Sequence, residues 1–259
     1  MVVQRRGYGN VSGHSKWAQI KRQKGVNDAR RGQLFTKLGR EISVAAREGG
    51  PDPNGNFRLR LAIQHARESN MPLENVERAI KRGTGANEGT SFEEMSYEGY
   101  GPGGIALIVQ ALTDNKNRTV ADVRSAFSRG GGSLGEAGCV SWMFQARGII
   151  TIDVAGKDPD VVSLAAIDAG AEDVVVDDDQ IQVLTAAAEL DAVRQALEKA
   201  GIPIASYEQS LVASTPLELD AKTAAGAMRL IERLEDLDDV QAVHTNAEFS
   251  DQAIEEYAS

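Results

Sequence analysis

Glycine-rich breaks divide this chain into segments whose apolar patterns differ from one another. Glycine and proline end helices and form turns, so each segment can hold only a few regular elements. The order of those elements therefore decides the fold class. The breaks are Gly49-Gly50-Pro51, Gly101-Pro102-Gly103-Gly104, Gly130-Gly131-Gly132 and Gly201-Ile202-Pro203.

The first segments carry a helical period. Residues 25–28 offer an N-cap, and apolar residues then recur every three to four positions until the break at 49–51, which predicts a helix. Further helices are predicted over 56–70 and from Pro72 to Gly83, with Pro72 in the first helical position and Gly83 as the C-terminal break. Residues 14–83 therefore indicate a small basic helical domain. The apolar stripe of the first helix consists of Leu34, Leu38, Ile42 and Ala45.

After a Gly/Asn-rich linker, strand and helix patterns alternate. Two strands for each helix indicate two α+β units of split βαβ type, each an antiparallel sheet covered by helices on one face. The breaks near Gly132 and Gly201 bracket a middle segment, which suggests a domain inserted into another. Strands are predicted at 95–100, 105–112, 140–144, 148–153, 173–176, 180–185, 206–213 and 240–246, and helices at 119–128, 160–169, 190–200 and 221–237.

Charge is segregated along the chain. The formal net charge is −10, yet residues 1–85 contain 17 Lys+Arg against 7 Asp+Glu, leaving 11 against 31 for residues 86–259. A basic N-terminal third in an acidic protein predicts nucleic-acid binding there. Three interpretations of the acidic part stay open: it orients the protein on its target by repulsion, it recruits a basic partner, or it confers solubility.

Several classes of protein are disfavoured. The single cysteine, Cys139, excludes an intramolecular disulfide and a thiolate zinc cluster. His14, His65 and His244 lack metal-ligand spacing, and no cofactor, metal, membrane or small-molecule substrate is expected. The glycine loop 99–104 precedes a strand, which indicates a turn and not a nucleotide site. Without a P-loop, a triad or clustered carboxylates, we expect a cytoplasmic protein that is not an enzyme.

The candidate nucleic-acid-binding residues lie in three places. The tract 14–24 combines cations with hydrogen-bond donors and one indole, which suits phosphates and unstacked bases; alternatively, Trp17 anchors this tail onto the helical domain. Cations of the first helix extend the surface, and the turn 115–118 either holds a phosphate or simply caps a helix. The candidates are His14, Ser15, Lys16, Trp17, Lys21, Arg22, Lys24, Arg30, Arg31, Lys37, Arg40, Asn115, Lys116 and Arg118.

Four motifs resemble the YebC/PmpR family in order and sequence, and the resemblance runs from Gly13 to about Phe249. Family chains begin near Gly13, so Val11 is a candidate for the true start of this chain. The motifs are Gly13-His-Ser-Lys-Trp-Ala-Gln-Ile-Lys21, Asn27-Asp-Ala-Arg-Arg-Gly-Gln-Leu-Phe-Thr-Lys-Leu38, Tyr97-Glu-Gly-Tyr-Gly-Pro-Gly-Gly104 and Thr113-Asp-Asn-Lys-Asn-Arg-Thr119.

The resemblance implies an α+β protein with an N-terminal three-helix basic bundle and two ferredoxin-like α+β domains, the third inserted into the second. The boundaries expected from it are 1–12 for a flexible extension, 13–85 for the bundle, 86–137 plus 204–250 for the second domain and 138–203 for the inserted one. It also implies regulation of gene expression without catalysis. We expect a ribosome-associated translation factor that contacts rRNA or tRNA through the basic arm; the alternative is a DNA-binding transcriptional regulator.

Overall fold

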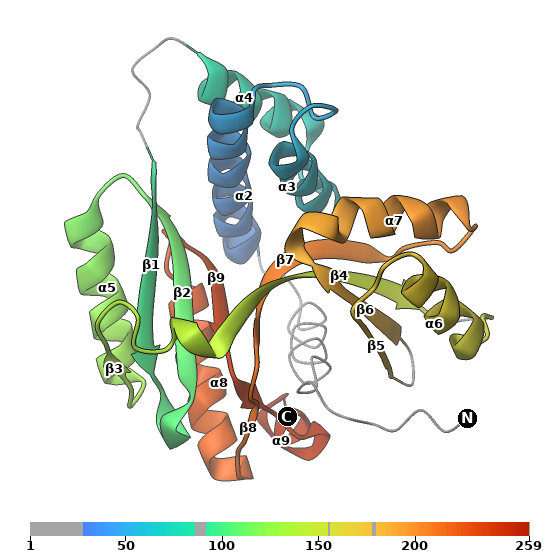
Figure 1. Cartoon of the computed structure of the whole chain (residues 1–259). Helices are drawn as coiled ribbons and strands as arrows, with labels where there is room; N and C mark the ends of the chain where they lie inside the picture. The colour runs from blue at the N-terminus through green and yellow to red at the C-terminus, as the bar shows by residue number, and fades with distance from the viewer. Residues whose placement is uncertain (1–27, 86–91, 155, 178–179, 259) are drawn as a thin grey trace. The chain divides into compact units, whose positions relative to one another are not determined.

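The computed structural model describes residues 28–85, 92–154, 156–177 and 180–258, which form two compact units (Figure 1). One unit contains residues 28–139 and 222–243, and the other contains 140–221 and 244–258. The mixture of N-terminal helices and antiparallel sheets confirms the predicted α+β class.

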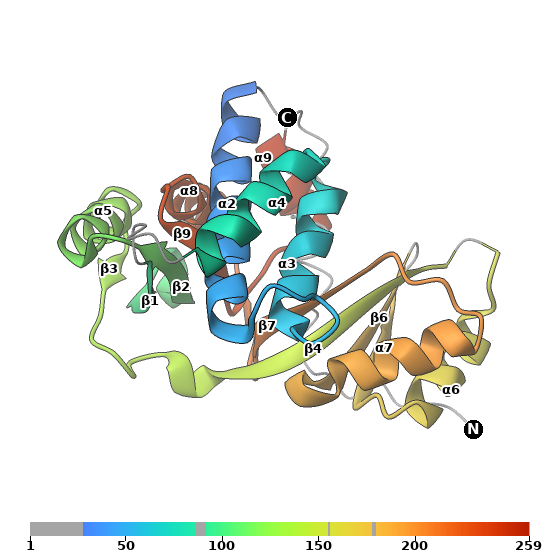
Figure 2. The same cartoon turned by 90° about the horizontal axis from the view of Figure 1, so that it is seen from above.

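The first unit opens with the three predicted helices, α2 (Asp28–Gly49), α3 (Phe57–Glu68) and α4 (Leu73–Thr84), which pack together as a bundle (Figure 2). The Asn56 side chain caps α3 by accepting from the amide of Leu59 at 3.0 Å. Helix α4 begins one residue later than predicted, because Pro72 is its N-cap. The three apolar stripes meet in one core built around Ile42, Ala45, Leu59, Ala62, Ala66 and Val76.

Two expectations for the bundle are wrong. Leu34, predicted to lie on the buried stripe, is exposed. Gly83 does not end α4, which continues to Thr84. A Cβ at Gly83 would lie 2.2 Å from the carbonyl oxygen of Ser43, so glycine is needed where α4 passes the backbone of α2. Close helix packing, and not a helix stop, accounts for this residue.

The same unit contains a four-stranded sheet in the order β3-β1-β2-β9. Strands β1 and β2 form a hairpin through the predicted glycine turn, in which Gly103 and Gly104 have φ of 73° and 79°. Strand β2 is buried along nearly all of its length. The elements are β1 (Glu93–Tyr100), η1 (Pro102–Gly104), β2 (Ala106–Thr113), α5 (Lys116–Arg129), β3 (Ser133–Leu134), α8 (Ala221–Glu235) and β9 (Val240–Thr245).

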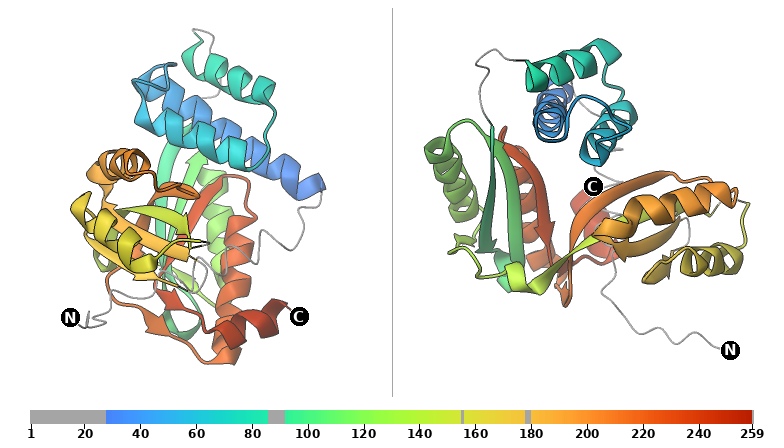
Figure 3. Two further views of the ribbon diagram at one scale, coloured as in Figure 1. Left: turned by 90° about the vertical axis from the view of Figure 1, so that its right-hand side faces the viewer. Right: turned by 45° about the horizontal axis from the view of Figure 1, so that its top comes forward.

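The second unit follows the βαββαβ order, and its antiparallel sheet has the order β5-β6-β4-β7. Helices α6 and α7 contact each other on this sheet (Figure 3). Its core includes Ile150 and Ile152 of β4 and Ile181 and Val183 of β6. The elements are η2 (Ser141–Met143), β4 (Phe144–Asp153), α6 (Pro159–Asp168), β5 (Asp173–Val176), β6 (Gln180–Ala186), η3 (Ala187–Glu189), α7 (Leu190–Lys199) and β7 (Ser206–Ala213), followed by β8 (Leu217–Glu218), β10 (Ala247–Glu248) and α9 (Asp251–Ala258).

The two sheets share one spatial plan in different chain orders. In the second unit, β4-α6-β5 is a split βαβ with β6 between its strands, and β7 follows α7. In the first unit, β2-α5-β3 is the split βαβ, β1 lies between its strands, and β9 follows α8. Strand β1 therefore takes the position of β6 but comes first in the chain. Both units use the split βαβ logic that the alternation predicted.

Three predictions for the α+β part differ from the structure. The helix expected from Thr119 begins at Lys116. The strand expected over 140–144 is wrong, because residues 141–143 form the 3-10 helix η2 and leave Trp142 75% exposed. The domain boundary expected at 203 also shifts, because β7 pairs with β4 along its whole length. The sheet of the second unit thus extends to Ala213.

None of the helices in the described part of the chain combines the length and the apolar character needed to cross a bilayer.

Candidate nucleic-acid interface

The predicted interface is only partly within the described residues. The tract 14–24, with its seven candidates, lies outside them, and Arg30 belongs to the first turn of α2, where the structure describes the backbone alone. Arg31 is exposed near the start of α2. The remaining candidates, Lys37 and Arg40 on α2 and the turn 115–118, all lie in the first unit.

One face of α2 binds the end of α8. Gln33, Lys37 and Arg40 follow each other at spacings of four and three, which places them on one side of the helix. The Gln33 Nε2 donates to the carbonyl oxygen of Asp236 at 2.6 Å, and Lys37 Nζ donates to that of Glu235. The last carbonyls of a helix lack internal partners and carry partial negative charge, so cations are favourable there. Lys37 thus acts as a capping residue for α8.

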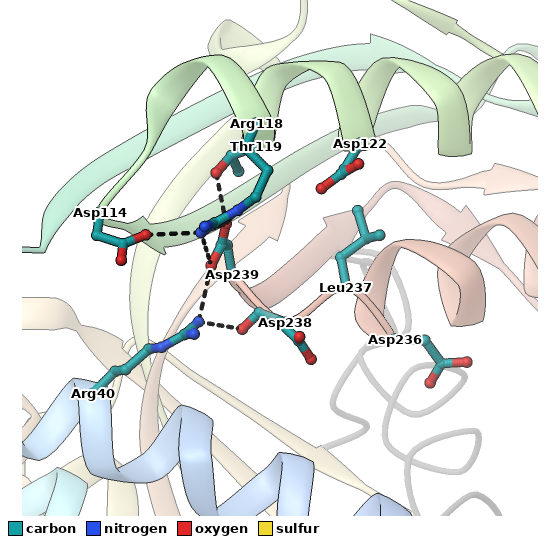
Figure 4. A pocket seen from close by; sticks show the side chains of 9 residues that line it. All are labelled: Arg40, Asp114, Arg118, Thr119, Asp122, Asp236, Leu237, Asp238 and Asp239. Carbon is teal, nitrogen blue, oxygen red and sulfur yellow. Dashed lines mark hydrogen bonds and ion pairs between the residues drawn. The ribbon is translucent and has the colours of Figure 1, made fainter.

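Arg40 and Arg118 converge on a buried carboxylate, that of Asp239 at the start of β9 (Figure 4). Arg40 Nη1 donates to Oδ1 at 3.0 Å, and Arg118 Nη2 donates to Oδ2 at 2.7 Å. The hydroxyl of Thr119 donates to Oδ2 at 2.7 Å. The Asp239 side chain is only 6% exposed, so these donors replace the water that it loses.

The electrostatics of Asp239 follow from these contacts. Burial alone would raise its pKa, but the hydrogen bonds from Arg118 and Thr119 and the charges of Arg118 and Arg40 outweigh burial and lower it. In return, the hydrogen bonds to Asp239 and Asp114 raise the pKa of Arg118. Asp239 is therefore ionised at neutral pH and binds both guanidinium groups.

The turn 115–118 is a helix cap that also carries ion pairs. The Asn115 side chain accepts from the Arg118 amide at 3.1 Å, which caps α5. Lys116 Nζ lies 2.6 Å from Oε2 of Glu93, and Arg118 Nη2 lies 2.8 Å from Oδ1 of Asp114. Of the two interpretations of this turn, capping is the one with observed contacts. A role in binding phosphate stays a prediction.

The pocket around Asp239 is acidic. Two arginines and five aspartates line it, a formal excess of three negative charges (Figure 4). This charge disfavours a phosphate. No group of three or more His, Cys, Asp or Glu side chains is arranged for a metal ion within the described residues. The lining consists of Arg40, Asp114, Arg118, Thr119, Asp122, Asp236, Leu237, Asp238 and Asp239.

Other cations of the bundle also face carboxylates. Arg58 Nε lies 2.8 Å from Oε1 of Glu41, and Arg58 Nη1 lies 2.7 Å from Oε2 of Glu48. On α4, Arg78, Lys81 and Arg82 are exposed. Glu74 and Glu77 stand one turn before Arg78 and Lys81, a spacing at which opposite charges attract on a helix. The outward surface of α4 is therefore of mixed charge.

The lone thiol has the character expected of a structural cysteine. Burial raises the pKa of Cys139, and the nearby Glu98 carboxylate raises it further. A thiol that stays protonated is a poor nucleophile. Cys139 is half-buried and lies outside the strands, because β4 begins later, at Phe144.

Sequence reasoning missed Asp239, the acceptor that joins two predicted cations. Its partners Arg118 and Arg40 are 121 and 199 residues away in the chain. The only local signal was an acidic pair, Asp238 and Asp239, directly before a predicted strand. Such a pair usually indicates a turn.

Comparison with known proteins gives concordant matches over most of the chain. A family model described as "TACO1/YebC protein N-terminal domain" matches residues 15–86, and one described as "TACO1/YebC second and third domain" matches residues 92–247. The chain is 54% identical over 249 residues to a protein of Dehalococcoides mccartyi (strain CBDB1), covering 96% of this chain and 99% of that one. It is 55% identical to a protein of Herpetosiphon aurantiacus with the same coverage. Both relatives are named "Probable transcriptional regulatory protein".

A solved structure is also similar. The crystal structure of a conserved hypothetical protein from Aquifex aeolicus superposes with a TM-score of 0.78 at 46% sequence identity. The match covers 86% of this chain and 93% of that one.

We predict that Asp239→Asn lowers the free energy of unfolding by about 1.5–3 kcal/mol, because the amide has no negative charge and puts an NH2 donor in place of one of the two oxygens that accept from the arginines. Denaturant unfolding measures this effect. Asp122→Asn is the matched control: Asp122 lines the same pocket but is exposed, so its change stays within about 0.5 kcal/mol. Equal effects of the two substitutions would contradict the role given to Asp239.

The stabilisation by Asp239 depends on pH. An unfolded aspartate has a pKa of about 3.9, and that of folded Asp239 is lower. The stabilisation is therefore present above about pH 4 and is lost as the pH falls through the folded pKa. We expect the difference in unfolding free energy between the wild type and Asp239→Asn to shrink as denaturation is repeated at pH values below about 4. A difference that stays constant with pH refutes this assignment.

Proposed function

The chain belongs to the TACO1/YebC family, and we propose that it regulates gene expression by binding nucleic acid, without catalysing a reaction. The observation that carries the proposal is the segregation of charge. The first 85 residues have a formal net charge of +10 and the remainder of −20. A basic segment of this kind binds phosphates by releasing their counterions, while the acidic remainder is repelled by them.

Within the basic third, the tract 14–24 is the contact that we favour. It holds Lys16, Lys21, Arg22 and Lys24, and acidic residues are almost absent before Glu41. Weaker candidates for contacting nucleic acid are Lys37, Arg40 and Arg118, because they already bind carbonyl and carboxylate oxygens of the first unit. Trp17 adds a ring that stacks on an unpaired base.

We propose RNA on the ribosome, either rRNA or tRNA, as the target. Sequence-specific RNA recognition uses unpaired bases that stack on aromatic side chains, which suits an arm bearing one indole. Reading a DNA major groove would instead need a helix with an open basic face. Two observations speak against α2 and α4 in that role: the Gln33, Lys37 and Arg40 face of α2 is occupied by the end of α8, and the outward face of α4 includes two glutamates.

A DNA-binding transcriptional regulator is the second candidate, and the printed names of the relatives favour it. It would use the same basic third on duplex DNA. The two candidates differ in what they bind specifically, and not in the charge that draws them to a phosphate backbone.

The basic tract can be tested by its salt dependence. Replacing Lys16, Lys21, Arg22 and Lys24 with alanine removes four phosphate contacts, so the slope of log affinity against log salt for single-stranded RNA should fall in magnitude by about 3. Fluorescence anisotropy of a labelled oligonucleotide measures this. The matched control replaces four exposed cations of the acidic part, Arg124, Lys222, Arg229 and Arg233, and changes the net charge equally. A control variant with the same loss of slope would show that total charge, and not the tract, governs binding.

The target can be tested by two assays in parallel. We expect the full chain to co-sediment with ribosomes in sucrose gradients, and the fourfold tract variant to leave the ribosome at a lower salt concentration. In gel shifts on duplex DNA, specific and random sequences should bind alike. A sequence-specific shift of duplex DNA without ribosome association would reverse the ranking of the two functions.

A further inference from the structure

Helix α6 exposes a stripe of large apolar side chains. Val161, Leu164 and Ile167 are 62%, 62% and 58% exposed. Their spacing of three residues aligns them along one side of the helix, and we name them the α6 stripe. The buried side of the helix carries Val162 and Ala166. Helix α6 is therefore apolar on two sides, and the core of the unit uses only one of them.

The strand that contacts α6 also ends in an exposed apolar residue. Strand β5 packs against α6 and ends in Val176, which is 51% exposed. Single exposed apolar residues are common on protein surfaces, but several gathered on adjoining elements mark an interaction site.

The sequence around the α6 stripe is rich in acidic residues. Residues 158–179 contain eight Asp and Glu and no Lys, Arg or His. Asp158 and Asp160 lie exposed at the start of α6, and Asp168 lies exposed at its end. One of the eight, Glu172, forms an ion pair with Arg147 of β4. Asp158, Asp160 and Asp168 thus place negative charge at both ends of α6, and we name them the acidic border of the stripe.

This combination of charge and apolar surface selects one class of partner. Nucleic acids and anionic membranes are repelled by the acidic border. A second copy of this chain that docked through its own α6 stripe would bring the same acidic border against the first. We propose that the α6 stripe binds a basic segment of another protein, in which aliphatic or aromatic residues pack on Leu164 and Ile167 while flanking Lys or Arg side chains meet the acidic border.

The test uses the full chain and two short synthetic probes. One is an amphipathic peptide of leucine and lysine, and the other has glutamate in place of lysine. We expect the Leu/Lys peptide to bind and the Leu/Glu peptide not to bind in isothermal titration. The double variant Leu164→Gln/Ile167→Gln should weaken the Leu/Lys complex about tenfold or more, since two apolar contacts are lost.

The chain offers a matched control in Leu73. It is a leucine of α4 that is 63% exposed, nearly the same as Leu164, and Leu73→Gln should leave the affinity within about twofold. Because all three substituted residues are exposed, the variants should keep the wild-type thermal unfolding midpoint.

Three results would overturn the proposal. In the first, the double variant and the Leu73→Gln control bind the Leu/Lys peptide equally. In the second, the Leu/Glu peptide binds as well as the Leu/Lys peptide, which would make the surface merely adhesive. In the third, sedimentation of the wild type reveals a dimer that Leu164→Gln abolishes, so that the occupant is a second copy.

Discussion

The carboxylate of Asp239 joins three parts of the first unit. Asp239 lies at the start of β9, and its side chain is almost completely buried. It accepts hydrogen bonds from Arg40 of α2 and from Arg118 and Thr119 of α5. A buried charge destabilises the fold unless it is paired and hydrogen-bonded. The Asp239 carboxylate therefore holds Arg40, Arg118 and Thr119 in contact with it. The bundle and the first sheet therefore form one compact unit and not two separate ones.

This ion cluster changes how the basic third is understood. Lys37, Arg40 and Arg118 contribute to its positive charge, yet each has an intramolecular acceptor. Cations in such contacts stabilise the unit and are less available to phosphates. Positive charge that is free to bind nucleic acid is thus expected from the tract 14–24, whose cations have few acidic neighbours in the sequence. For the second unit we propose a different kind of partner, a basic protein segment at the α6 stripe.

Local sequence signals predicted the elements well. Helices α2, α3 and α4 and most strands lie within a few residues of their predicted positions, because periodicity and capping act over neighbouring residues. The alternation of Val140, Trp142 and Phe144 was misleading, since a 3-10 turn next to a strand can carry the same pattern. Gly83 was misread for a related reason: its role depends on Ser43 of another helix.

Contacts between residues far apart in the chain could not be predicted from the sequence. The partner of β7 is β4, more than 50 residues earlier in the chain, and nothing in 206–213 distinguishes that strand from those of the first sheet. The candidate site shows the same limit. Arg40 and Arg118 were identified as functional cations from composition, but their common acceptor emerges only when β9 lies beside β2.

The central claim, that the tract 14–24 contacts nucleic acid, can be tested through its indole. The chain contains two tryptophans, Trp17 and Trp142, so Trp142→Phe leaves Trp17 as the sole tryptophan. Titration with single-stranded RNA should quench its fluorescence through stacking on the bases, and the quenching should disappear as salt is raised. Unchanged Trp17 emission while anisotropy shows the RNA to be bound would contradict the claim.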